Sequence, residues 1–291
     1  MVLNISIFNF LFLVLVIPIS LVFEGIRRKI IARMQNRIGP PIWQPFYDVI
    51  KLLQKRESDS SANENIMFQI MPFIYLITTF SLFLFLPFPV ISFHLDFIFF
   101  IYVFIVSGTL YILLGAVSNS PYGYIGSMRE MSLMLCYELI FAIVIFSFVV
   151  FSNIQSLSGF NENWMILKLP IASACLFIIT LAEIRITPYD TVEAYTEIIG
   201  SAETEFSGRS LAFFEISKNL KLAFFMFLTS LLFFGFKDLL TFSITSLIVL
   251  FALTFTEATT CRYRLDQTLK ILIIVLFFAV FEFIRINFIV W

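Results

Sequence analysis

The run FIFFIYVFIVSGTLYILLGAV, residues 97–117, decides the fold because it holds no charged side chain and is long enough to cross a bilayer. A transmembrane helix needs about 20 consecutive apolar residues, and a membrane β-strand would show alternation instead of a continuous run. Similar runs occur along the whole chain, at about residues 3–23, 66–87, 97–117, 131–151, 164–182, 211–235, 239–257 and 270–290. The sequence therefore predicts an all-α integral membrane protein with about eight transmembrane helices.

The composition agrees with this fold class. Of 291 residues, 60% are hydrophobic and 13% are charged, which excludes an ordinary soluble domain. A net charge of −1 gives no sign of a nucleic-acid partner. Cys136, Cys175 and Cys261 lie far apart and His94 is the single histidine, so neither an iron–sulfur nor a zinc ligand set is present in the sequence. We therefore expect no cofactor in this chain.

The distribution of basic residues predicts the membrane topology. Arginine and lysine gather between the first and second runs, and more arginines lie in the third, fifth and seventh loops. Because positive charge favours the cytoplasmic side, we expect these odd-numbered loops in the cytoplasm and both termini outside. The first run lacks the basic start and cleavage site of a removed signal peptide, so we interpret it as a membrane helix. Residues 1–291 then form one polytopic domain with two long cytoplasmic loops, 24–65 and 183–212.

The first long loop has an amphipathic pattern. Apolar and basic positions are interleaved from Ile26 to Met34, which is typical of a helix lying on the membrane surface. Gly39-Pro40-Pro41 should break that helix, and a second amphipathic helix is expected from Phe46 to Leu53. Composition alone leaves open whether this loop is a simple headgroup anchor or a docking surface.

The second long loop is unexpectedly acidic for a cytoplasmic segment. If residues 190–200 are helical, Asp190, Glu193 and Glu197 share one face, where closely spaced carboxylates could exchange protons. The alternative is a solvated acidic loop that docks on a basic partner. The acidic residues in and beside this loop are Glu183, Asp190, Glu193, Glu197, Glu203, Glu205 and Glu215, against Arg185 and Arg209.

Several charged residues fall inside or at the ends of the apolar runs, where they are costly and usually face a bundle interior. Glu138 lies in the fourth run and is the strongest functional candidate, with Glu130 two helical turns before it at the cytoplasmic end. Lys218 and Lys221 open the sixth run. Glu282 and Arg285 in the eighth are expected to form a local pair.

Two segments carry a resemblance to a known family. EGIRRKIIARMQNRIGPPIWQPFYDVIKLLQK (24–55) resembles the first cytoplasmic loop of subunit 1 of respiratory complex I and of its relatives in membrane-bound NiFe hydrogenases. AEIRITPYDTVEAYTEIIGSAETEFSGRSLAFFEISK (182–218) is similar to the third cytoplasmic loop of the same family. Tyr137-Glu138 and the segment from Arg262 to Gln267 are smaller matches, so the resemblance covers nearly the whole chain in order.

The resemblance implies a non-catalytic anchor for a peripheral redox arm, with an acidic passage toward antiporter-like membrane subunits. Glu215 has no secure counterpart in the family and is included for its burial and local charge. The residues expected along the passage are Glu138, Glu183, Asp190, Glu193, Glu197, Glu205 and Glu215. Those expected at the docking surface or the cavity mouth are Arg27, Arg28, Arg33, Arg37, Arg185, Arg262, Arg264 and Asp266.

Departures from the family pattern favour the hydrogenase or sulfane-reductase branch. The stretch from Gly39 to Pro45 is compressed relative to complex I members, and Tyr195 and Ser207-Gly208-Arg209 look closer to that branch. We then expect ferredoxin as donor, pumping of protons or sodium ions, and hydrogenase-like large and small subunits carrying iron–sulfur clusters and a NiFe centre. One alternative is a quinone-site subunit of NADH:quinone oxidoreductase, in the inner mitochondrial membrane. Another is a purely structural membrane scaffold.

Overall fold

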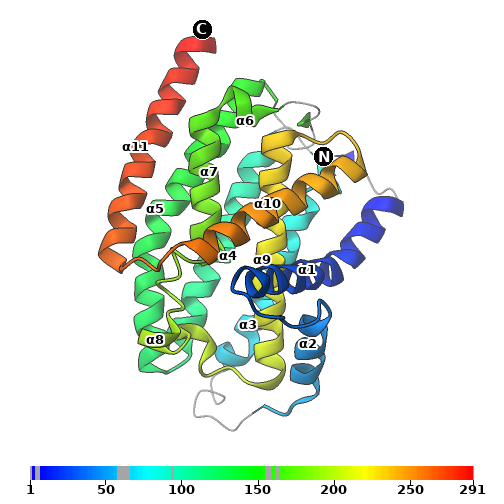
Figure 1. Cartoon of the computed structure of the whole chain (residues 1–291), viewed down its shortest axis with the longest axis vertical. Helices are drawn as coiled ribbons and strands as arrows, with labels where there is room; N and C mark the ends of the chain where they lie inside the picture. The colour runs from blue at the N-terminus through cyan, green and yellow to red at the C-terminus, as the bar shows by residue number, and fades with distance from the viewer. Residues whose placement is uncertain are drawn as a thin grey trace.

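The computed structural model describes residues 2–3, 7–57, 66–92, 95–154, 159–160 and 164–290, which form a bundle of helices (Figure 1). Within these ranges, six helices are long and apolar enough to cross a membrane. They are α1 (Ile7–Met34), α3 (Ile66–Ser81), which a short 3₁₀ turn (Leu82–Leu84) extends, α4 (Asp96–Val117), α5 (Pro121–Ser152), α9 (Gly208–Phe234) and α10 (Leu239–Thr259). The all-α membrane class is confirmed.

The remaining two expected spans take a different form. The fifth, 164–182, is split into α6 (Met165–Lys168) and the 14-residue α7 (Pro170–Glu183). The break falls at Leu169, because a residue before proline is disfavoured in the α region and the proline itself has no N–H to donate. The eighth expected run lies within α11 (Leu265–Val290), where Arg285 bonds Glu282 at 2.6 Å as the local pair predicted.

The first loop contains one separate helix where the sequence predicted two. The basic segment from residue 26 is the end of α1 itself instead of a separate surface helix, since nothing between residues 19 and 34 breaks the helix. The chain then turns through Gly39, whose φ of 75° suits glycine, into α2 (Gln44–Gln54), which is the second amphipathic helix expected. The returning loop packs so closely that a Cβ at Gly25 would lie 2.0 Å from the Ile42 carbonyl oxygen.

A short β-pair was not expected. Strand β1 (Val2–Leu3) pairs antiparallel with β2 (Ile91–Ser92), which ties the start of α1 to the loop before α4. With two residues in each strand, this pair leaves the helical class of the protein unchanged.

Helix α9 is the centre of the bundle. In its most apolar window 94% of residues are buried, against 33–56% in the other five long helices. Phenylalanines of α9 pack on rings from several neighbours: Phe225 meets Phe104 of α4 edge-on at 5.5 Å, and Phe224 meets Phe83 at 5.9 Å. Such buried edge-to-face pairs fix the position of α9 relative to α3 and α4.

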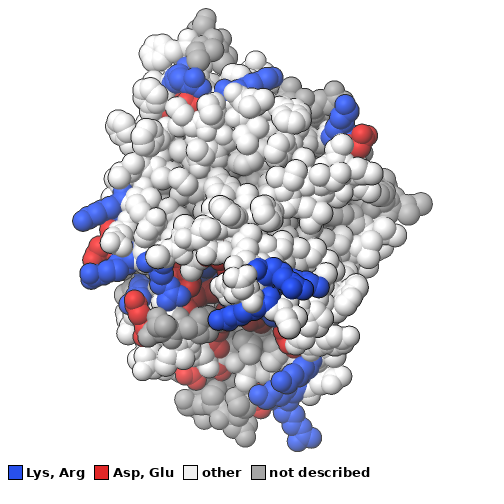
Figure 2. Space-filling model, viewed as in Figure 1, with Lys and Arg blue, Asp and Glu red and all other residues white. Residues whose placement is uncertain are grey.

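Charge is distributed unevenly over the bundle. The end of α11 and strand β1 lie toward the upper end in Figure 1, whereas α2 and the segment around α8 (Tyr195–Ile198) lie at the lower end. Most charged side chains visible in Figure 2 gather over this lower half, beneath a broad white surface. The acidic loop therefore meets the bundle where its helices also bring buried charges together.

Candidate functional site

The segment after α7 places three expected carboxylates in three different environments. Residues 184–194 form turns instead of a helix, and only Tyr195–Ile198 (α8) is helical, so the expected shared face of Asp190, Glu193 and Glu197 does not exist. Thr191 and Val192 are β-branched and have low helix propensity, and Asp190 and Glu193 pair with Arg262 and Lys218 on other elements. Glu197 points outward, 53% exposed, to Arg129 at 2.7 Å, and this guanidinium lowers the pKa of its carboxyl.

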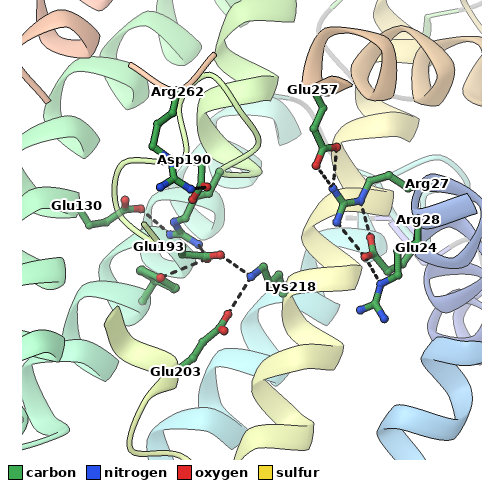
Figure 3. A network of polar contacts seen from close by, with 12 residues as sticks. Glu24, Arg27, Arg28, Glu130, Asp190, Glu193, Glu203, Lys218, Glu257 and Arg262 are labelled. Carbon is green, nitrogen blue, oxygen red and sulfur yellow. Dashed lines mark hydrogen bonds and ion pairs between the residues drawn. The ribbon is translucent and has the colours of Figure 1, made fainter. Parts of the chain in front are cut away.

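Asp190 and Glu193 turn the other way, toward the bundle (Figure 3). Asp190 forms an ion pair with Arg262 from the loop between α10 and α11. Glu193 is buried and forms an ion pair with Lys218 of α9, which also bonds Glu203 at 2.8 Å. Burial raises the pKa of the Glu193 carboxyl, although the Lys218 ammonium opposes that shift. Burial likewise raises the pKa of Asp190 against the effect of Arg262.

Arg185 connects this loop to the membrane helices. Its side chain is 4% exposed, and Nη2 lies 2.5 Å from Oε1 of Glu130 on α5, while Nη1 lies 3.8 Å from Oε1 of Glu193. The guanidinium also lies 3.3 Å from the ring centre of Tyr111 on α4, a cation–π contact. Burial disfavours its charge, but Glu130 and the surrounding groups raise the pKa of Arg185 well above its ordinary value. One buried cation thus bridges two carboxylates.

Hydroxyl groups lie beside both carboxylates that Arg185 bridges. Tyr111 donates its hydroxyl to Glu193 at 3.3 Å, and Tyr137 donates to Glu130 at 2.5 Å. Both tyrosines are buried, at 1% and 2% exposure. Since a hydroxyl can both donate and accept a hydrogen bond, each tyrosine adds one group that can carry a proton beside its carboxylate.

Two further expected acids lie on the membrane helices. Glu183 ends α7 and pairs with Lys221 of α9 at 2.7 Å, with side-chain exposures of 1% and 3%. Glu138 follows on α5, and in the described part of the chain no hydrogen-bond partner reaches its buried Oε1. A buried carboxylate oxygen without a partner is costly, which makes the half-buried Glu138 a candidate functional position.

Gly108 of α4 leaves the space into which Glu138 points. A Cβ at Gly108 would lie 2.7 Å from Oε1 of Glu138, so Gly108→Ala must displace that carboxyl. We expect the variant to assemble, because a side chain can yield, and to pump ions poorly. Gly115→Ala is the matched control, since its Cβ would meet the Gly123 backbone carbonyl at 2.8 Å and cost about 1–3 kcal/mol in stability. Normal pumping by assembled Gly108→Ala would contradict this role for Glu138.

A second ion-pair cluster joins α1 to α10. Arg27 bonds Glu24 at 2.7 Å and Glu257 at 2.8 Å, while Arg28 bonds Glu24 at 2.8 Å and Asp48 of α2 at 3.0 Å. Arg27 and Arg28, predicted to dock a redox arm, are therefore engaged within the chain. Arg33 and Arg37, at the end of α1 and in the following turn, are exposed.

A cavity of about 270 Å³ separates the two clusters. Both ion-pair clusters contribute charged groups to its wall. Three of the expected carboxylates, Asp190, Glu193 and Glu215, line it together. The lining includes Glu24, Arg27, Arg28, Arg185, Asp190, Glu193, Glu215, Lys218 and Glu257.

A second cavity of about 310 Å³ lies at the rim of the acidic loop. Its lining includes expected docking residues from α11 and from the loop before it. The surface ion pair between Arg129 and Glu197 lies in the same lining. Its charged lining is Arg129, Glu197, Arg262, Arg264 and Asp266. Glu205 is half-buried and lines neither cavity.

The raised pKa of Glu193 predicts a pH dependence. The folded chain holds this proton more tightly than the unfolded chain, so its contribution to stability is full below pH 4.5 and is lost as the pH rises through the raised pKa. Glu193→Gln should flatten this part of the profile. Thermal unfolding of the purified complex at several pH values measures it, and an unchanged slope in Glu193→Gln would assign the dependence to other groups.

Metal ligands are not gathered in the described ranges. No three His, Cys, Asp or Glu side chains there lie together as a possible metal site, and Cys136, Cys175 and Cys261 are separate free thiols. His94 lies outside the described residues.

Sequence reasoning missed several members of the network. Glu130 was placed at a helix end, but it is 1% exposed and bonded to Arg185. Tyr111 and Glu257 carried no signal, since a tyrosine in an apolar run and a glutamate at a helix end are common. Lys218 and Lys221 did carry one: two lysines, three residues apart in an otherwise apolar run, require buried acids as partners.

The comparisons with known proteins point to one family. A family model described as NADH dehydrogenase matches residues 6–287. "NADH-ubiquinone oxidoreductase chain 1" of Bradypus variegatus is 29% identical over 91% of this chain and 90% of its own length. An NADH-quinone oxidoreductase subunit of Geobacillus sp. (strain WCH70) is 31% identical over 84% of this chain and 81% of its own length.

One solved structure also has the same fold. A chain from the archaeal membrane-bound sulfane sulfur reductase, a respiratory membrane complex, superposes with a TM-score of 0.87. The match covers 96% of this chain and 98% of that one, at 22% identity.

Proposed function

The chain belongs to the NADH dehydrogenase family of complex I-related membrane subunits, and we propose that it couples a peripheral redox arm to ion movement in a respiratory complex. The observation that carries this proposal is the buried network that begins at the charged cavity and ends at Glu138. Chance burial of so many charges is implausible, because each costs several kcal/mol to remove from water.

The network brings acidic, hydroxyl and ammonium groups close together between the cavity and the membrane helices, and we infer that a proton moves along them. From the cavity, Glu193 is linked through Arg185 to Glu130, and Tyr111 and Tyr137 lie beside these two carboxylates. Lys221 pairs with Glu183 and interacts electrostatically with Glu138, which extends the path into the helices. Charge that arrives on a docked redox subunit would be felt strongly here, because screening is weak in a low-dielectric interior.

The reaction we propose for the whole complex is ferredoxin oxidation coupled to reduction of protons or of polysulfide. The expected partners are hydrogenase-like large and small subunits, which would carry the iron–sulfur clusters and the NiFe centre, and antiporter-like membrane subunits. The compressed segment 39–45, folded tightly against Gly25, supports this branch, as does the charged lining of the cavity, which suits a long isoprenoid tail poorly. The complex would lie in the cell membrane, with both termini of this chain outside and protons or sodium ions pumped.

A quinone-site subunit is the second candidate. It is favoured by the names of the curated relatives, which are quinone or ubiquinone oxidoreductase subunits at 29–31% identity. This function requires an apolar tunnel from the membrane to the cavity.

Electron-acceptor assays on the purified complex separate the two candidates. With reduced ferredoxin as donor, we expect hydrogen or sulfide as product and no effect of quinone-site inhibitors. Reduction of a short-chain quinone by NADH, blocked by those inhibitors, would instead establish the quinone branch. Sequencing the genes beside this one provides an independent check, since a NiFe large subunit with its metal-binding cysteines is expected there for the hydrogenase.

A further inference from the structure

An apolar groove lies on the flank of the bundle, away from the charged network. Helices α6, α7, α9 and α10 line it, and α7 and α10 both pack against α9. The groove has a volume of about 470 Å³, and its described lining contains no charged side chain. It is formed by Ile166, Pro170, Ser173, Ala174, Phe177, Phe233, Phe234, Ile248, Val249 and Ala252.

The shape of the groove suits a hydrocarbon chain. Its α7 wall consists of Pro170, Ser173, Ala174 and Phe177, which recur at the spacing of one helix face and extend over about 10 Å of helix. Pro170, Ser173 and Ala174 on this wall have small side chains, and Ala252 lines the groove from α10. These small side chains leave the space that forms the groove.

The outer end of the groove has the features of a membrane interface. Trp164 is 59% exposed and packs edge-on against Phe234 at 5.6 Å, and Trp is enriched at the headgroup level. Lys168, the last residue of α6, is exposed and lies in sequence two positions from each of the lining residues Ile166 and Pro170. An ammonium within one helical turn of two lining residues complements a phosphate whose hydrocarbon chain enters the groove.

We propose that this groove binds one hydrocarbon chain of an anionic phospholipid, whose phosphate pairs with Lys168. The lipid fills the space between α7 and α10 and supports α7, the short helix that carries Glu183 at its other end. This assignment is independent of the function proposed for the charged network.

The test measures phospholipid retained by the purified complex. After extensive detergent washing, native mass spectrometry of the wild type should show a bound phospholipid. Ala252→Phe fills the groove and should remove it. Lys168→Gln should weaken retention of anionic phospholipid about fivefold, the value of one lysine–lipid contact of about 1 kcal/mol, and leave zwitterionic lipid unaffected. Leu247→Phe, on the exposed face of α10, is the control and should retain the lipid.

Two results would overturn the proposal. Equal retention by the wild type, Ala252→Phe and Lys168→Gln would show that the lipid binds elsewhere. Absence of bound lipid from the wild type, together with crosslinking of an Ala174→Cys variant to a companion subunit, would show that a protein helix covers the groove. If Ala252→Phe fails to assemble, Ser173→Leu narrows the groove from α7 and replaces it in the same measurement.

Discussion

Glu138→Gln should abolish ion pumping by the assembled complex while electron transfer through the redox arm continues. The amide keeps the size of the side chain but cannot release a proton, and Glu138 is the last acid of the buried network. Loss of one required acid–base group lowers the rate of a proton-transfer step about 10²-fold or more. The measurement is the number of ions moved per electron in proteoliposomes, with the electron-transfer rate recorded in the same samples. Glu183→Gln should have the same effect.

The matched control is Glu197→Gln. It makes the same chemical change, but Glu197 is 53% exposed and paired at the surface with Arg129. We expect normal pumping from this variant. If Glu138→Gln and Glu183→Gln also pump normally with intact assembly, both leave the pathway. If instead the three variants assemble poorly and none loses coupling alone, the chain is a purely structural scaffold.

The sequence was sufficient for the membrane class, because a bilayer imposes length and apolarity on every span. It also indicated α2, since an eight-residue amphipathic pattern that follows Pro40 and Pro41 is typical of a short surface helix. It was misleading at α1, where a change from apolar to basic composition looked like a boundary. Composition changes there at a membrane surface, but backbone hydrogen bonding does not, and the helix continues to Met34.

The site was predicted by residue type more accurately than by arrangement. The acidic bias of the chain and the family resemblance together singled out Glu183, Glu193 and Glu138, and the structure buries Glu183 and Glu193 and leaves Glu138 half-buried. Which partner each acid meets could not be read from spacing: Arg185 reaches Glu130 across 55 positions, and Tyr111 reaches Glu193 across 82. These partners are set by how α4, α5 and α9 pack, which is a property of the folded bundle.

Arg185→Met should destabilise the protein by about 3–5 kcal/mol, because it leaves Glu130 buried without its cation. The effect should appear as a lower unfolding temperature and a lower yield of assembled complex. Arg264→Met is the control: that arginine is exposed, and its loss should change stability by about 0.5 kcal/mol or less. A small effect in Arg185→Met would mean that Glu130 is neutral in the folded chain.

The double variant Arg185→Met with Glu130→Gln separates stability from coupling. Replacing both charged members of a buried pair is often neutral or stabilising, so assembly should recover. Pumping should be lost, because neither the bridge from Glu193 nor the acid at Glu130 remains. Recovery of pumping together with assembly would show that this pair only holds the loop against the bundle, and the proton path would then have to run through other groups along the cavity.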